Sequence, residues 1–133
     1  MFVSTQMPAF NQGFVDTCLT TSVPPLPVIF PNLSETTVSV PTIFNIFIWA
    51  MPAQNNLTVA TVSVGCPTPG ILSGTFFAGT KMLVSSVKTF YGGMPVNKCF
   101  GTTGQNGAPP YVTPFNTPGT QISPSQVTVM VLT

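Results

Sequence analysis

The sequence predicts an all-β protein: a small body of many short strands with rough threefold symmetry. Three observations predict it, namely short strand-like runs separated by Gly and Pro turns, the lack of any helical apolar period, and a recurring tripeptide. The tripeptide occurs as Met7-Pro8-Ala9, Met51-Pro52-Ala53 and Met94-Pro95-Val96, at intervals of 44 and 43 residues. Such even spacing indicates one small unit used three times, and three units closing on one another would bury their apolar faces.

The first half of the chain holds several strand candidates, each short and either alternating in polarity or rich in β-branched and aromatic residues. They are residues 28–30, 35–40, 43–49 and 58–64. Pro31 is predicted to end the first of them, and the tripeptide at residues 51–53 to turn the chain after the third. In the fourth, Ala60, Val62 and Val64 are predicted to share one face.

The second half is predicted to contain a long hairpin and a closing strand. By composition, residues 65–70 form a loop, Gly92-Gly93 lies in the third turn, and residues 101–120 are loop-like because Gly and Pro are frequent there. The predicted strands are residues 71–77, 81–91 and 126–132.

The composition favours a single domain, residues 1–133, and excludes some classes of function. Charged residues make up 4% of the chain, against about 25% in ordinary soluble domains. No Arg is present, so nucleic-acid binding is not expected. The surface is predicted to be covered mainly by Ser, Thr, Asn, Gln, Gly and Pro, which favours a protein that works inside an assembly.

Neither a membrane span nor a secretion signal is predicted. The longest apolar run, residues 43–51, is nine residues long and contains Asn45, whereas a span needs about 20. The N-terminus lacks the basic and apolar regions of a signal peptide. If the protein leaves its cell, we expect another machine to carry it.

The residues that usually perform catalysis are scarce, so we predict no enzyme and no catalytic residue. The chain has no His, which removes the commonest general base and metal ligand. Asp16 and Glu35 are the only carboxylates, and Asp16 is expected to hydrogen-bond its own backbone in a turn. We expect Lys81, Lys88 and Lys98 to be solvated, because no motif pairs them with a catalytic group.

Three widely spaced cysteines, Cys18, Cys66 and Cys99, indicate no disulfide framework. The simplest interpretation is that all three are buried, reduced thiols. Alternatively, one cysteine from each unit could meet on the threefold axis and bind a metal as thiolates. The three cysteines are out of phase with the repeat, however, so no metal is predicted.

The order of short motifs resembles the PAAR-like spike-tip proteins of contractile injection systems. The resemblance is carried by FIWAMPAQNNLTVATVSVG, GILSGTFFAGTKMLVSSVKTFYGGMPVNKCFG, TTGQN, ISPSQVTVMVLT, and FVDTCLT with PPLPVIFPNLS, and it covers most of residues 14–133. It implies a sharp, conical body of short β-hairpins with pseudo-threefold symmetry. The broad base of this cone would sit on the blunt end of a trimeric VgrG-type β-helical spike, as in type VI secretion or a phage tail. The residues of that interface are not assigned by the sequence.

The resemblance also implies a structural function. The cone would sharpen the spike for puncturing a membrane, with one tip per trimer, and would help to deliver effector or toxin proteins. It would be made in the bacterial cytoplasm, assembled on the apparatus and ejected, without stable membrane insertion. The alternative is a free-standing secreted β-domain that binds a surface ligand.

The chain departs from the family pattern in two ways. Metal-binding PAAR tips hold zinc near the apex with His and Cys, and no His is available here. We therefore predict no cofactor, with the tip held by packing alone or by cysteines. No further domain flanks the motifs, so any toxic activity is expected to belong to a separate protein.

Overall fold

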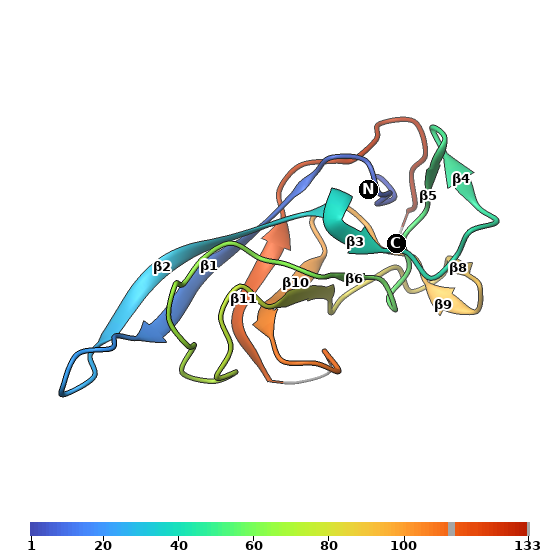
Figure 1. Cartoon of the computed structure of the whole chain (residues 1–133). Helices are drawn as coiled ribbons and strands as arrows, with labels where there is room; N and C mark the ends of the chain where they lie inside the picture. Colours follow the sequence, from blue (N-terminus) through green and yellow to red (C-terminus); the bar gives the residue numbers. More distant parts are fainter. Residues whose placement is uncertain (112–113, 133) are drawn as a thin grey trace.

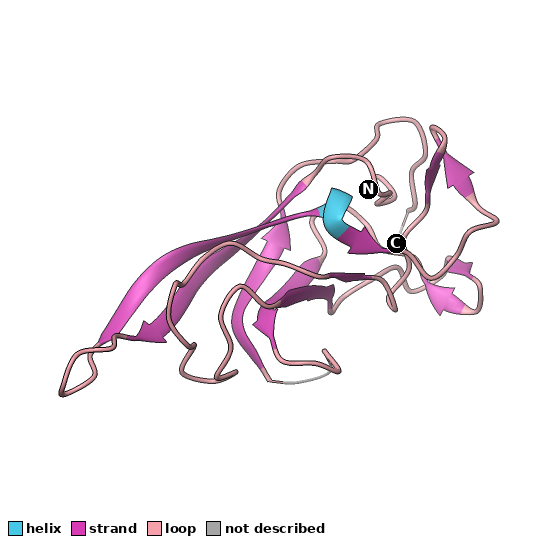
Figure 2. Ribbon diagram, viewed as in Figure 1, coloured by secondary structure: helices cyan, strands magenta, loops and turns pink. Residues whose placement is uncertain are grey.

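The computed structural model describes residues 1–111 and 114–132 (Figure 1). Within these ranges the only helical element is the single 3-10 turn η1 (Thr36–Val38), and the remaining regular structure is β-strand (Figure 2). The all-β prediction is therefore confirmed. None of the helical structure in the described chain is long and apolar enough to span a bilayer.

A curled, seven-stranded antiparallel sheet forms most of the body (Figure 1). In spatial order its strands are β2 (Pro27–Glu35), β1 (Phe10–Leu19), β11 (Phe115–Gln121), β10 (Thr102–Gly107), β7 (Gly79–Met82), β6 (Val59–Ala60) and β3 (Ser39–Val40). The long β1–β2 hairpin extends away from the rest, so the molecule narrows toward the loop between these strands.

Strand β2 continues through Pro31, where the sequence predicted that it would end. Proline is tolerated because β2 is an edge strand and because the β1–β2 register shifts at this point, between Gly13 and Asp16. A bulge leaves one residue without a ladder partner, and such a position needs no backbone donor.

Three short hairpin-like pairs gather at the end opposite the β1–β2 loop (Figure 1). Two are true hairpins, β4 (Phe47–Ile48) with β5 (Met51–Pro52), and β8 (Phe90–Tyr91) with β9 (Met94–Pro95). The third pairs the two ends of the chain: Phe2 bridges Met130, and the Val131 N–H donates to the Met1 carbonyl at 2.7 Å.

A closed cycle of backbone hydrogen bonds joins the three pairs, and we call Ser4, Gln54 and Asn97 the threefold ring. The Gln54 N–H donates to the Ser4 carbonyl (3.0 Å), and the Asn97 N–H donates to the Gln54 carbonyl (3.1 Å). The Ser4 N–H donates to the Asn97 carbonyl (2.9 Å) and closes the cycle. The pseudo-threefold prediction is thus confirmed. Its first unit was misplaced, however, because the segment equivalent to residues 51–54 and 94–97 is Met1-Phe2-Val3-Ser4 and not Met7-Pro8-Ala9.

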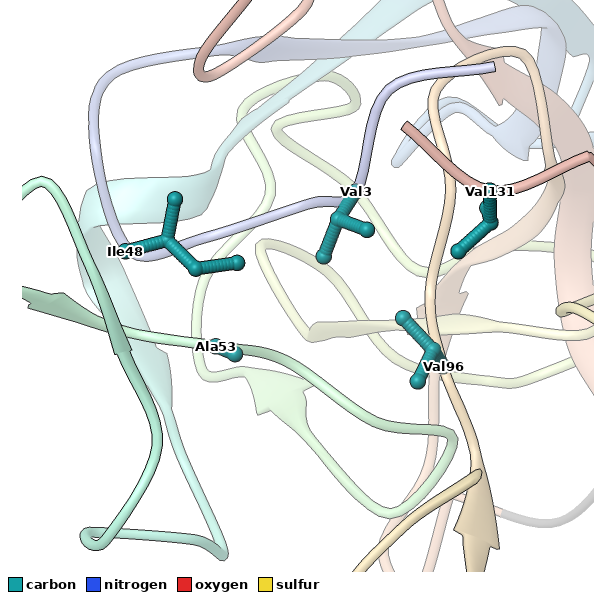
Figure 3. Close-up of a cluster of buried hydrophobic side chains, with 5 residues drawn as sticks. All are labelled: Val3, Ile48, Ala53, Val96 and Val131. Carbon is teal, nitrogen blue, oxygen red and sulfur yellow. The ribbon is translucent and has the colours of Figure 1, made fainter. Parts of the chain in front are cut away.

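The apolar core lies on the axis of this ring. Val3, Ala53 and Val96 occupy equivalent positions, one residue before each ring residue, and each is 0% exposed. Ile48 and Val131 complete the cluster, whose side chains converge from separate segments (Figure 3). The repeat therefore builds a small apolar centre that no single unit could enclose.

The polar residues do not simply cover the surface, as the composition predicted. Many are buried in the curled sheet, and Gln105, Gln121, Asn106 and Thr103 are at most 1% exposed. Conversely, many large apolar side chains are exposed. An amide and hydroxyl interior is stable only where its groups hydrogen-bond one another, as Ser4 Oγ does to Gln121 Oε1 (2.6 Å).

Several predicted strand boundaries are wrong. Residues 101–120 were predicted to be a loop, yet they contain β10 and part of β11. Their glycines permit close packing: a Cβ on Gly119 would lie 2.4 Å from the Gln12 carbonyl. In residues 58–64 only Val59–Ala60 form a strand, Ser63 is buried, and Val62 and Val64 are exposed.

Other segments are also less regular than predicted. The predicted strand at residues 35–40 turns through η1 before β3, and residues 71–77 contain no strand. In the tripeptide at residues 51–53, Met51–Pro52 form β5, and the turn falls on Trp49 and Ala50 before it. Residues 126–132 pair only through the isolated Met130 bridge and neighbouring hydrogen bonds. Isolated two-residue pairs lack the length that a period-2 pattern needs.

The equivalent hairpin turns offer a matched stability test. Trp49 and Ala50 have positive φ (55° and 61°), as do Gly92 and Gly93 (60° and 79°). Because a left-handed conformation costs a side-chain-bearing residue about 1 kcal/mol, we expect Ala50→Gly to raise the free energy of unfolding by about 1 kcal/mol and the melting temperature by about 4 °C.

The converse change, Gly93→Ala, is the control for this turn. A Cβ on Gly93 meets no atom within 4 Å, so its effect isolates backbone conformation from packing. We expect Gly93→Ala to destabilise by a similar amount in thermal unfolding followed by circular dichroism. If both substitutions stabilised the protein, the assigned turn geometry would be contradicted.

Candidate functional site

The end of the molecule that carries the three short pairs presents equivalent apolar side chains to solvent. Phe47, Phe90 and Met130 hold the same position in their pairs, opposite Pro52, Pro95 and Phe2. Their exposed fractions are nearly equal, at 56%, 54% and 57%. We call these three side chains the apolar triad.

Other residues of this end repeat the same symmetry. Met1, Met51 and Met94 are equivalent, and Met1 and Met51 are exposed by 49% and 41%. Trp49, at the tip of one pair, is 62% exposed and donates from Nε1 to Thr128 Oγ1. This end thus carries exposed apolar side chains in an approximately threefold arrangement, which makes it a candidate surface for a threefold partner.

The sequence contains a signal for two members of the apolar triad, although the Met-Pro repeat alone does not include it. A phenylalanine stands four residues before each of the later Met-Pro dipeptides, Phe47 before Met51 and Phe90 before Met94. The third member, Met130, could not be found this way, because the pair that contains it is formed by opposite ends of the chain.

A second candidate site is a buried polar cluster near the far end of β1, around Asp16. The Asp16 carboxylate is 0% exposed. Its oxygens accept hydrogen bonds from Asn32 Nδ2 (2.7 Å), Asn106 Nδ2 (3.4 Å) and Asn116 Nδ2. Asp16 was predicted to cap its own turn. Instead it joins β2, β10 and β11, because side chains from all three strands reach it.

Cys18 and Cys66 complete this cluster, and they form a disulfide across 48 residues of sequence. The prediction of three reduced thiols is therefore wrong for this pair. Cys18 Sγ lies 3.8 Å from Asp16 Oδ1, and Cys66 Sγ lies 3.3 Å from the Asp16 main-chain oxygen. Sequence spacing gave no sign of the pairing, because residue 66 lies in a loop that isolated bridges, Leu33 to Val64 and Cys18 to Gly70, hold beside β2 and β1.

Cys99 is buried and free, as predicted. Burial raises the pKa of its thiol, while a backbone hydrogen bond from Phe100 and the terminal ammonium partly oppose that effect. The three cysteines do not meet on the threefold axis, so the thiolate site considered there does not form. Asp16, Cys18 and Cys66, by contrast, bring their ligand atoms within 4.8 Å of one another.

These three residues offer donor types that bind zinc, but they do not fit the family's implied zinc ion: they lack its histidines, and the two sulfurs are bonded to each other. Carboxylate oxygen and cysteine sulfur are both zinc ligands. Asn32 adds an observation of its own, since its Oδ1 is buried and has no hydrogen-bond partner. In the disulfide state, however, the sulfurs are not available as thiolates.

The other candidate catalytic residues do not assemble. Glu35 pairs with Phe10 at the other end of β1 from Asp16, and six strand residues span about 20 Å. The two carboxylates therefore do not form a pair across one substrate. Lys88 is exposed and Lys81 and Lys98 are half-exposed, as expected for solvated side chains.

The comparisons with known proteins identify one family. Residues 9–111 match the family described as Toxin PAAR-like domain. The matched span includes Asp16, Cys18, Cys66 and two units of the threefold ring, whereas the terminal pair that forms the third unit lies outside it. Neither the comparison with curated proteins nor that with solved structures finds a match.

Proposed function

Because the chain belongs to the Toxin PAAR-like domain family, we propose that it is a structural tip for a trimeric spike of the VgrG type in a contractile injection system. The spike would belong to a type VI secretion system or a phage-like tail. The proposed role is to cap and sharpen the spike, to aid membrane puncture, and to accompany effector or toxin proteins. No catalytic activity is proposed.

The apolar triad is the observation that supports this proposal most directly. A trimeric shaft ends in three equivalent surfaces, and a single chain can satisfy all three only if it repeats the same contact three times. Phe47, Phe90 and Met130 offer such a repeat, with nearly equal exposure around the ring. Burying each of them would stabilise the complex by about 1.5 kcal/mol.

The other end of the molecule suits passage through lipid. Two hydrogen bonds connect the segments at this end: the Leu19 N–H donates to the Pro69 carbonyl, and Thr75 Oγ1 donates to the Asn106 carbonyl. The segments around residues 20–26, 70–78 and 108–111 therefore belong to the same end. None of these segments contains a charged residue. Each charge at bilayer depth costs about 2.5–3.5 kcal/mol, so an uncharged apex lowers the barrier to puncture.

The proposal is tested by binding to a recombinant VgrG-type trimer from the same organism. We expect one tip per trimer by size-exclusion chromatography with light scattering. Phe47→Asp, Phe90→Asp and Met130→Asp should each weaken binding at least about tenfold, since each removes one buried apolar contact and introduces a charge. The triple variant should not bind.

Ile29→Asp is the matched control, because Ile29 is 64% exposed on β2, away from the triad. It should bind the trimer like the wild type. A soluble monomer with no affinity for any VgrG-type trimer would favour the free-standing binding module instead. Equal weakening by Ile29→Asp would place the contact on the side of the sheet.

A further inference from the structure

The curled sheet encloses a small polar cavity that the proposed spike contact does not use. Its volume is about 20 Å³, and eleven residues of the described chain line it, each at most 6% exposed. Nine of them are polar and none is charged. Gln54 and Asn97 of the threefold ring are among them, so the cavity lies beside the ring. It shares no residue with the apolar core or with the Asp16 cluster.

Two side chains in this lining have a polar atom without a hydrogen-bond partner in the described protein. The atoms are Asn11 Oδ1 and Thr80 Oγ1, and the two residues are 5% and 3% exposed. Gln121 Oε1 in the same lining, by contrast, already accepts a hydrogen bond from Ser4 Oγ (2.6 Å). Because burying a polar atom without a partner is costly, the two unpaired atoms indicate a ligand in the cavity.

The two unpaired atoms belong to strands that are not neighbours. Asn11 lies in β1 and Thr80 in β7, and β11 and β10 separate these strands in the sheet. Asn11 pairs with Gln121 and Thr80 pairs with Ala60, so the sheet ladder does not join them. Both residues nevertheless line one cavity, because the sheet curls (Figure 1). A molecule in the cavity therefore lies between two strands that the sheet itself holds apart.

We propose that the cavity binds one water molecule, which donates a hydrogen bond to Asn11 Oδ1 and forms another with the Thr80 hydroxyl. A buried water needs about 10–15 Å³ of space and two or more polar partners, and this cavity supplies both. The bound water ties β1 to β7 across the interior of the sheet. This inference concerns the polar interior and does not depend on the proposed function.

The chemistry of the lining favours water over a metal cation. The Asn11 oxygen only accepts hydrogen bonds, whereas the Thr80 hydroxyl both donates and accepts. Water complements both atoms, since it too donates and accepts. A cation would have no carboxylate beside it, because no charged residue lines the cavity, and burying an unpaired charge is costly.

The first test locates the water in the wild-type chain. A crystal structure at a resolution that shows ordered waters should contain one water in the cavity. Its oxygen should lie within about 3 Å of both Asn11 Oδ1 and Thr80 Oγ1. In solution, magnetic relaxation dispersion of water oxygen-17 counts the long-lived internal waters, and this water should be among them.

Two substitutions at residue 80 separate the hydroxyl from its packing. Thr80→Val removes the hydroxyl and keeps the shape, so the count of internal waters should fall by one. The melting temperature should fall by about 4 °C, because hydrogen bonds to the water are lost. Thr80→Ser keeps the hydroxyl and should keep the water.

Thr117→Val is the matched control. Thr117 is 0% exposed, its hydroxyl accepts from the Val15 N–H (3.3 Å), and it does not line the cavity. The same substitution at this position should therefore leave the water count unchanged. A lower count in Thr117→Val would overturn the proposal, because the lost water would then not report on the cavity.

The sign of the stability change tests for a dry cavity. If no water were bound, Thr80→Val would remove an unpaired buried hydroxyl and raise the melting temperature, which would overturn the proposal. An empty cavity or two waters in the wild-type crystal structure would also overturn it, as would an unchanged water count in Thr80→Val. A melting temperature that rises with Na⁺ or K⁺ over equal choline chloride would show a cation instead. If Thr80→Val does not fold, the wild-type crystal structure decides alone.

Discussion

Val96→Asp is expected to lower the free energy of unfolding by about 4 kcal/mol. The substitution removes a fully buried apolar side chain and places a carboxyl group in the apolar cluster. Val96 lies on the axis with Val3 and Ala53, so all three units of the ring lose a contact together. A domain of this size has a total stability of about 5–15 kcal/mol, and we expect the melting temperature to fall by about 15 °C.

Val87→Asp is the control for this change, since Val87 is 75% exposed. It should alter stability by less than about 0.5 kcal/mol. Chemical denaturation followed by circular dichroism measures both variants on one scale. Equal stability of the two variants would contradict the view that the ring axis is a structural core.

Reduction of the Cys18–Cys66 disulfide is expected to have an effect of similar size. The disulfide closes a loop that spans 48 residues. Breaking it increases the chain entropy of the unfolded state, which lowers the free energy of unfolding by about 4 kcal/mol in the loop-entropy model. The comparison uses oxidised and reduced wild type in urea, with a metal chelator present in both samples. Cys18→Ala combined with Cys66→Ala should match the reduced wild type, because it lacks the same cross-link.

Cys99 provides a check on this comparison. Its thiol is free and buried, so the reductant should not change its state, and the reduced-minus-oxidised difference should persist in Cys99→Ser. A reduced chain as stable as the oxidised one would contradict the prediction. It would mean that the hydrogen bonds around Asp16 already restrict this region without the covalent bond.

The sequence predicted the fold class and the symmetry but misplaced the first unit. Met7-Pro8 has the Met-Pro dipeptide of the other two units but not the strand pairing that defines a unit. In the true first unit, Phe2 stands where the other two units have proline. Its pairing with Met130 defines the position, and that pairing does not require proline. A repeat divided between the two ends of a chain also gives no even spacing to find.

The interior was the harder part to predict. Burial scales place amides and hydroxyls outside, yet Gln105, Gln121 and Asn106 are 0% exposed. Only the three-dimensional arrangement of the strands shows which polar groups hydrogen-bond to one another. The Asp16 cluster was missed for this reason, since Asn106 and Asn116 lie about 90 and 100 residues from it in sequence.

The terminal pair has a consequence for how the molecule is made. Met1 and Val131 are hydrogen-bonded across a sequence separation of 130 residues, so this pair can close only after the segment around residue 131 has been synthesised. Until that segment is present, Val3 and Val131 cannot pack together, and the apolar centre cannot form. The amide-lined sheet, whose β1–β2 hairpin is local, is therefore the part able to assemble during synthesis, and contacts of such long range close slowly.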